Sequence, residues 1–184
     1  KIERDISEFA KDHFESVILR PTSVFGINGE PLKKLAADIV SGSRWKSYLK
    51  SCLFGRRRMN LVPVANVVAA IIFLARYSGR FESELFIVSD DDDPKNNFID
   101  VERILMKVLG IQDYRFPQLP VPLRVLKLLL TSLGRNNVNP RCNFDPTKLR
   151  KLGFKSPVSL REGLTEYAAW YRATLSAVKF GKTP

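Results

Sequence analysis

Short aliphatic runs alternate along this chain with longer stretches in which apolar residues recur every three or four positions. Two of the runs, at 17–19 and 84–88, have the length and composition of strands buried on both faces. A typical longer stretch begins near Pro31, continues with apolar residues to Val40 and ends at Gly42, as a helix would. Strands that alternate with helices predict an α/β chain with parallel pairing.

The same periodicities predict the remaining elements. A third short strand is expected at 59–62, and a turn that is solvated is expected at the four aspartates 90–93. Further helices are expected at 1–13, after Pro63, and at 98–109, 123–133, 146–152 and 158–178. The basic, aromatic segment 43–58, the proline-spaced connector 112–122 and the polar segment 134–143 are expected to be irregular. Such strands are too few for a complete doubly wound sheet.

The end of the first strand is the most informative place for function. Pro21 stops the run at 17–19, Thr22 and Ser23 place small hydroxyls in the loop beyond it, and Gly26 closes that loop. In open α/β sheets, ligands bind outside the carboxyl ends of the strands. Local chemistry alone fits a ligand-facing loop and an ordinary core strand followed by a loop equally well.

Four segments together resemble one known family. Residues 19–26, L-R-P-T-S-V-F-G, resemble the L-R-P-x-x-V-[YF]-G signature of the extended short-chain dehydrogenase/reductase family, the NAD-dependent sugar-nucleotide epimerases and dehydratases. Residues 59–68 are similar to its second marker, with Pro and Asn where the family usually has His and Asp. Residues 143–154 and 159–164 are similar to its closing L-G-[WF] and L-x-E-G-L segments. The resemblance covers nearly the whole chain, in the family's order.

This resemblance implies roles at the cofactor end of the site. Lys1 looks like the catalytic lysine of the family's Y-x-x-x-K helix, which bonds the nicotinamide ribose and lowers the pKa of the tyrosine. That tyrosine would lie four residues before Lys1. Pro21 and Thr22 would line the nicotinamide end through backbone groups, and Ser23 stands where many sugar epimerases carry a substrate-binding Asn. The alternative for Lys1 is a terminal lysine without a role.

Two arginines lie where the family often binds the substrate diphosphate. Arg58 stands beside the second marker, and Arg135 lies ten residues before Asp145. Guanidinium groups suit a diphosphate because they offer paired donors, although either residue could equally be a solvated surface arginine. Trp45 and Tyr48 could stack on a uracil or pack against their own segment.

Composition narrows the choice of compartment and partner. The 184 residues carry 30 Lys and Arg against 19 Asp and Glu, so the net charge is +11 and anionic partners are favoured. Cys52 and Cys142 form no paired motif and His13 is the single histidine, which argues against a zinc site or a disulfide framework. The stretch 121–133 is too short and too charged to span a bilayer. A cytoplasmic location, with membrane association as an option, fits best.

The sequence therefore predicts an α/β chain that is the C-terminal part of a Rossmann-like sheet plus a small, mostly helical substrate-binding domain. Residues 1–30 would end the dinucleotide-binding domain and 31–184 would bind substrate, with strand 84–88 returning to the main sheet. The sequence has no glycine-rich turn for a pyrophosphate, so NAD would bind tightly only in the intact enzyme, an isomerase or oxidoreductase.

The expected partners are a nucleotide-sugar, with a UDP-sugar favoured, the missing N-terminal half of the enzyme, and a second copy in a homodimer of the intact protein. Without that half, no turnover is expected. An alternative function is a non-catalytic accessory module of the same fold that docks a membrane surface or an acidic partner. Nucleic acid is disfavoured, because no helix-turn-helix, zinc-finger or aromatic RNP-like pattern accompanies the positive charge.

Overall fold

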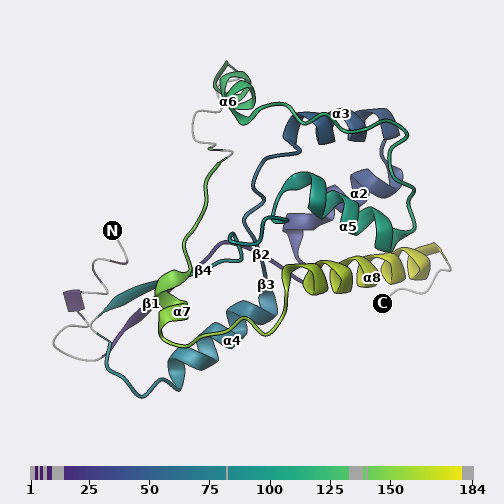
Figure 1. Ribbon diagram of the computed structural model, residues 1–184. Helices are drawn as coiled ribbons and strands as arrows, with labels where there is room; N and C mark the ends of the chain where they lie inside the picture. Colours follow the sequence, from purple (N-terminus) through teal and green to yellow (C-terminus); the bar gives the residue numbers. More distant parts are fainter. Residues whose placement is uncertain are drawn as a thin grey trace.

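The computed structural model describes residues 3, 5, 8, 9, 15–81, 83–132, 139 and 141–179 (Figure 1). Two residues predicted for the site, Lys1 and Arg135, lie outside the described residues, as does most of the helix expected at 1–13.

The described strands form two parallel pairs. β1 (Val17–Pro21) pairs with β4 (Glu84–Val88), in a register that runs from Val17 opposite Glu84 to Pro21 opposite Val88. β2 (Ser23–Phe25) pairs with β3 (Leu61–Pro63). β1 and β4 confirm the two predicted runs, and β3 confirms the third strand within two residues. β2 was wrongly expected to be loop, because three residues are too few to show a strand period and their partner lies far away in the sequence.

Seven helices have bounds in the described part of the chain. They are α2 (Glu30–Ser41), α3 (Arg44–Phe54), α4 (Val64–Ala75), α5 (Phe98–Leu109), α6 (Leu123–Ser132), α7 (Thr147–Lys151) and α8 (Leu160–Lys179). Six were predicted. The expectation of irregular structure at 43–58 was wrong for residues 44–54, because α3 buries two serines, Ser47 and Ser51, and so shows no inward apolar stripe for a periodicity to reveal.

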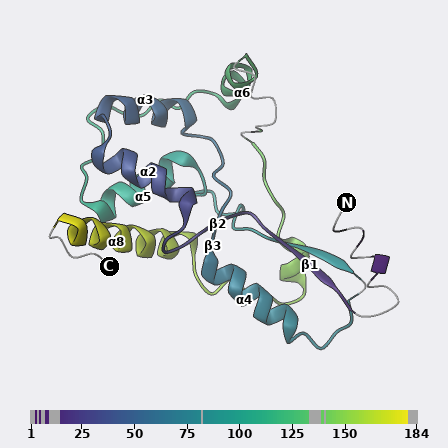
Figure 2. The same ribbon diagram turned by 180° about the vertical axis from the view of Figure 1, so that it is seen from behind.

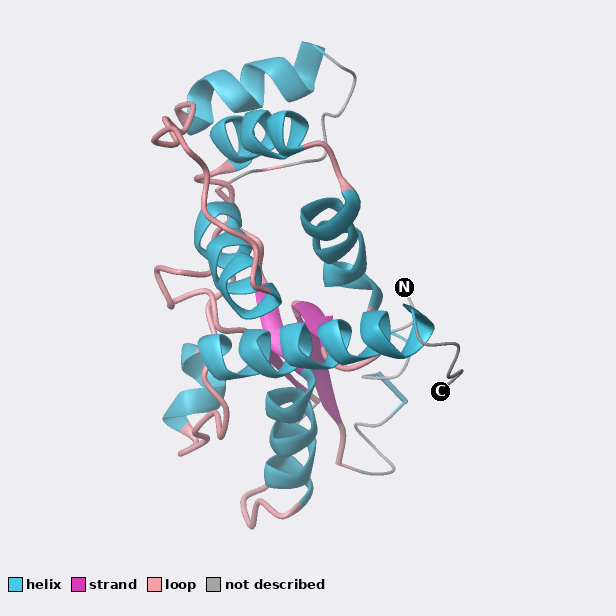
Figure 3. Ribbon diagram, turned by 90° about the vertical axis from the view of Figure 1, so that its right-hand side faces the viewer, coloured by secondary structure: helices cyan, strands magenta, loops and turns pink. Residues whose placement is uncertain are grey.

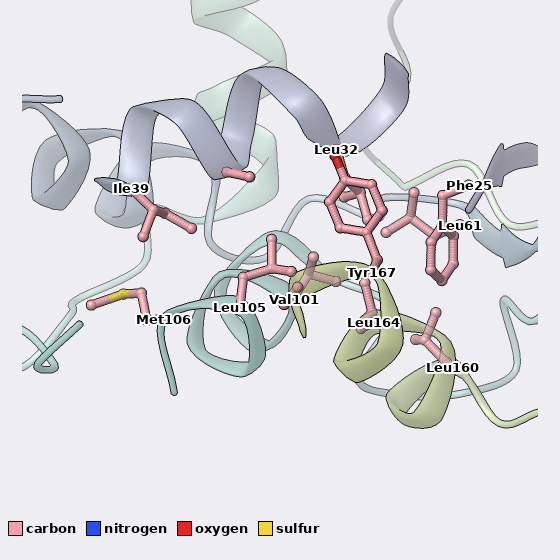
Figure 4. Close-up of a cluster of buried hydrophobic side chains, with 12 residues drawn as sticks. Phe25, Leu32, Ile39, Leu61, Val101, Leu105, Met106, Leu160, Leu164 and Tyr167 are labelled. Carbon is pink, nitrogen blue, oxygen red and sulfur yellow. The ribbon is translucent and has the colours of Figure 1, made fainter. Parts of the chain in front are cut away.

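One core joins α2, α5 and α8 to β2 and β3. Figure 4 shows Leu32, Leu105 and Leu164 from the three helices directed toward one another, with Tyr167 beside them. All four side chains are at most 1% exposed. α8 also approaches β3 closely, since a Cβ at Gly163 would lie 3.0 Å from the ring of Pro63. Glycine at this position lets the helix seat on the strand.

A second core lies between the β1–β4 pair, α4 and α7. Its fully buried members include Val62, Ala70, Phe86 and Leu149. The two cores occupy successive levels of the molecule. In Figures 1 and 2, α3 and α6 lie at one end, α2, α5 and α8 in the middle, and β1, β4, α4 and α7 at the other end, and Figure 3 shows the same order from the side.

Candidate functional site

The two strand pairs meet where β1 ends. The register of β1 and β4 puts the carboxyl ends of both strands at the same edge, at Pro21 and Val88. Beyond that edge the Thr22 amide donates to the Val88 carbonyl at 3.0 Å, and the Ser23 amide donates to the Asn60 carbonyl at 2.8 Å. The three predicted residues Pro21, Thr22 and Ser23 are thereby brought together at the point where the chain passes from one sheet to the other.

The hydroxyl of Thr22 has no partner. Its Oγ1 is buried and neither accepts nor donates a hydrogen bond among the described residues. A buried hydroxyl without a partner is destabilising by about 1–3 kcal/mol, so pairing it with a polar group would be stabilising. The carboxamide at the nicotinamide end of NAD is such a group, although it would reach this hydroxyl only if the loop around it opened. The chain offers no glycine-rich turn to hold the pyrophosphate, so the residues present fit one end of that cofactor and not the other.

Asn60 joins this edge to two other parts of the chain. Its backbone is left-handed, with φ +51°, a conformation that asparagine adopts more readily than most residues. Its Nδ2 donates to Asp91 Oδ2 at 2.6 Å and to the Cys142 carbonyl at 2.9 Å. Asn60 thereby anchors the chain at Cys142. Sequence reasoning passed over it, although an asparagine just before a short strand is a usable signal.

The aspartate run contributes two buried carboxylates to the same region. Asp90 is 7% exposed and Asp91 is 0% exposed, so the expectation of a solvated turn was wrong for both. Asn66 donates to Asp90 Oδ2 at 3.0 Å, and the Phe144 amide donates to Asp91 Oδ2 at 2.9 Å. Burial raises the pKa of Asp90, and the hydrogen bond from Asn66 opposes that shift. Sequence composition could not show this because the partners are distant in the chain.

A buried amide satisfies the backbone of β3. Asn96 is 0% exposed, accepts from the Leu61 amide at 3.0 Å and donates to the Leu61 carbonyl at 2.9 Å. The side chain thus replaces a neighbouring strand, which keeps the buried backbone groups paired. Together, Asn60, Asn66, Asp90, Asp91 and Asn96 form what we call the polar cluster.

Arg58 lies beside this cluster, two residues before Asn60. It forms an antiparallel bridge with Asn97, and its Nη1 donates to the Asp93 carbonyl at 3.0 Å. The side chain is half-buried. Because the guanidinium group carries five N–H donors, this one hydrogen bond fixes its position without using its full capacity. Ser23 and Arg58 are therefore on segments that touch through Asn60.

Trp45 and Tyr48 lie elsewhere, on α3. Their rings stack on each other with centroids 5.6 Å apart, and the Tyr48 hydroxyl donates to the Pro117 carbonyl at 3.1 Å. Tyr48 is thus packed against its own segment and the connector, whereas Trp45 stacks on Tyr48 and stays 61% exposed.

The arrangement at the β1 edge suits binding better than covalent chemistry. Neither hydroxyl, of Thr22 or Ser23, makes a hydrogen bond to a basic side chain among the described residues, so neither is activated as a nucleophile. No group of three or more potential metal ligands occurs in the part of the chain that the structure describes. What the edge brings together is a set of backbone groups, the buried hydroxyl of Thr22, the hydroxyl of Ser23 and one arginine.

Comparison with known proteins identifies the fold. No family model matches the sequence, and no curated protein matches it. Solved structures do match: UDP-glucose 4-epimerase of Thermotoga maritima, crystallised with UDP-glucose, superposes with a TM-score of 0.62 at 20% identity, over 94% of this chain and 51% of that one. The dTDP-glucose 4,6-dehydratase of Bacillus anthracis, in complex with NAD, gives 0.62 at 14% identity, over 95% and 50%.

A third structure, UDP-glucose 4-epimerase of Thermus thermophilus in complex with NAD, gives a TM-score of 0.60 at 18% identity, over 92% of this chain and 51% of that one. This chain therefore spans about half the length of these proteins. The chain has the mixed α/β, Rossmann-like fold of NAD-dependent sugar-nucleotide epimerases and dehydratases, over about half of that fold.

Proposed function

We propose that this chain is the C-terminal, substrate-binding part of an NAD-dependent nucleoside-diphosphate-sugar epimerase or dehydratase. The observation that carries the proposal is the meeting of Pro21, Thr22 and Ser23 with the Arg58–Asn60 segment, just beyond the carboxyl ends of β1 and β4. That is where ligands bind in open α/β sheets. The shared fold with enzymes of this class supports the assignment.

Each predicted residue has a proposed task. Ser23 donates to the sugar or the diphosphate, and Arg58 and Arg135 bind the diphosphate with charge-assisted hydrogen bonds. Pro21 and Thr22 meet the nicotinamide end of NAD, and Lys1 bonds its ribose. NAD, when bound, accepts a hydride from the sugar and later returns it. The residues of this chain hold and orient the sugar nucleotide during that exchange.

The surface of α4 supports a further proposal, that the N-terminal half of the enzyme docks on it. This helix has no charged residue, and three side chains on one stripe, Val64, Val68 and Ile71, are 47%, 48% and 54% exposed. A helix that is apolar all round is normally buried. Beside it, β1 has one described partner, β4, so its other edge offers unpaired backbone groups to a further strand. We also propose that the intact enzyme forms a homodimer.

Calorimetric titration with UDP-glucose at low salt tests the binding role. We expect weak, salt-sensitive binding and no turnover. Arg58→Ala should weaken binding by about tenfold or more, as expected for loss of a hydrogen bond to a charged group, and Ser23→Ala by about two- to tenfold. Arg80→Ala is the matched control, since its side chain is 94% exposed and distant in sequence from the site. Absence of any binding heat at low salt would overturn the phosphate-binding roles.

A further inference from the structure

α3 and the connector that follows α5 form one continuous surface. Arg44 donates to the Gln112 carbonyl at 2.8 Å near the start of α3, and the Val121 amide donates to the Cys52 carbonyl at 2.8 Å near its end. Between these points Tyr48 bonds the connector at Pro117. The connector therefore runs beside α3 along its whole length and leads directly into α6.

This surface exposes large apolar side chains. Trp45 and Leu49, one turn apart on α3, are 61% and 49% exposed, and Phe116 and Leu119 on the connector are 62% and 76% exposed. On α6, Val125 and Leu128 are 48% and 70% exposed. Trp45 and Phe116 line the same cleft, so α3 and the connector bring these two aromatic groups together. Because α3 turns its serines inward, its apolar residues are left outside.

The same surface carries most of the net charge. Residues 43–57 and 111–132 contain eight Lys and Arg and a single acidic residue, Asp113, so they hold +7 of the chain's +11. Neither α3 nor α6 has an acidic residue in its first turn. We call the surface made by 43–57 and 111–132 the α3–α6 surface.

We propose that the α3–α6 surface docks on an anionic lipid bilayer. Lysine and arginine near a bilayer are attracted by acidic headgroups, and exposed Trp, Phe and Leu gain from entering the interface. A nucleic acid would satisfy the charge but leave the six apolar side chains in water. A second copy would bring two strongly positive surfaces together. No helix in the described residues is long and apolar enough to cross a membrane, and the attachment proposed is peripheral.

Docking through the α3–α6 surface would leave the rest of the molecule accessible. α3 and α6 lie at the end opposite β1, β4 and α4 in Figures 1 and 2, so docking covers neither the apolar stripe of α4 nor the β1 edge. The proposal therefore stands independently of the proposed function.

Co-sedimentation with vesicles tests whether the positive charge of the surface contributes to binding. Vesicles of phosphatidylcholine with phosphatidylglycerol should bind the chain, and vesicles of phosphatidylcholine alone should not. The double variant Arg124→Glu, Lys127→Glu should bind more than tenfold more weakly, since each basic residue near such a surface contributes about fivefold. The control variant Lys155→Glu, Arg161→Glu makes the same change in net charge at exposed positions elsewhere. Its affinity for the acidic vesicles should fall much less.

Fluorescence tests the apolar contact. The chain has two tryptophans: Trp45 is exposed, and Trp170 packs against the first core. Phosphatidylglycerol vesicles should shift the emission to shorter wavelength, and Trp45→Phe should abolish the shift. Leu119→Ser with Leu128→Ser should weaken vesicle binding about tenfold or more. These positions are exposed, so thermal melts should show that the variants fold.

Three results would overturn the proposal. The first is no binding to the acidic vesicles. The second is binding to duplex DNA as tight as to vesicles, with the two serine substitutions having no effect on either. The third is self-association that buries Trp45 in the absence of lipid.

Discussion

The lobe of α2, α5 and α8 and the layer of β1, β4 and α4 bury their apolar residues very differently. In the lobe, three helices from distant parts of the sequence close around side chains such as Leu32, Leu105 and Leu164, which are all 0% exposed. In the layer, α4 buries one side on the strands and leaves Val68 and Ile71 about half exposed. The lobe encloses its apolar residues, whereas the apolar stripe of α4 is covered by no other element in the described part of the chain.

This difference bears on how the candidate site works. Pro21, Thr22 and Ser23 lie at the seam between the two regions, held on one side by β4 and on the other by β3. We propose that the lobe side supplies a frame for the substrate. We propose that the cofactor-binding half attaches on the layer side, at the edge of β1 that no described strand pairs with.

Truncation of the lobe core should have the largest effect. Leu105→Ala should lower the free energy of unfolding by about 2–5 kcal/mol, because it removes buried methyl groups and leaves a cavity. Ile71→Ala, on the exposed stripe of α4, should cost less than about 1 kcal/mol. Urea denaturation followed by circular dichroism measures both. Equal losses would show that α4 is already covered in solution, and would contradict the difference between the lobe and the layer.

A substitution in the polar cluster should cause the second-largest loss of stability. Asn66→Ala removes the hydrogen bonds to Asp90 and to the backbone of Val158, and it leaves a buried carboxylate underpaired. We expect a loss of about 2–3 kcal/mol in the same urea measurement. Gln112→Ala, whose side chain is exposed, is the control and should change stability by less than about 0.5 kcal/mol. A small effect of Asn66→Ala would mean that the seam is not held by this cluster.

A buried carboxylate gives the lobe a pH dependence. Burial raises the pKa of Glu102 above its ordinary value of 4.5, although the hydrogen bond from Tyr114 opposes the shift. The folded state therefore binds a proton more tightly than the unfolded state, and this residue's contribution to stability falls as pH rises from 4.5 through the raised pKa. Each unit of increase corresponds to about 1.4 kcal/mol.

Glu102→Gln removes that titration. The variant and the parent should be similarly stable near about pH 4, and the variant should gain relative to the parent as pH rises toward neutrality. Unfolding by urea at a series of pH values measures the difference, with the exposed Glu166→Gln as control. A difference that does not change with pH would contradict the assignment.

The smallest effect is expected at an exposed ion pair. Arg150 donates to both oxygens of Asp92, at 2.6 and 2.9 Å, and lowers the pKa of that carboxyl. Both side chains are substantially exposed, so Arg150→Ala should cost about 0.5 kcal/mol or less, and salt should reduce even that. A loss above about 2 kcal/mol would show that α7 depends on this pair more than its exposure suggests.

The elements with strong periodicity could be predicted from the sequence. β4 and α5 have the predicted bounds, since a continuous aliphatic run and a helix capped by Asn97 and Gly110 are local signals. The place of Pro21 to Ser23 at the carboxyl end of β1 followed from the same local pattern. The family resemblance anticipated the fold that the solved structures show.

What escaped prediction depends on distant partners. α3 turns serines inward because Gln118 bonds Ser51 at 2.6 Å, a contact that no window of the sequence contains. Asp90 and Asp91 are buried because asparagines on other segments meet them. Asn60 was missed for the same reason, since its importance comes from holding Ser23, Asp91 and Cys142 together.

The most direct test of the central claim is a map of backbone amide shifts, recorded by NMR on the labelled chain as UDP-glucose is added. The account predicts the largest changes at Thr22, Ser23, Arg58 and Asn60, the residues that meet at the seam between the two strand pairs. Changes confined to other regions, such as α3 or the outer face of α8, or no changes at all at low salt, would contradict it.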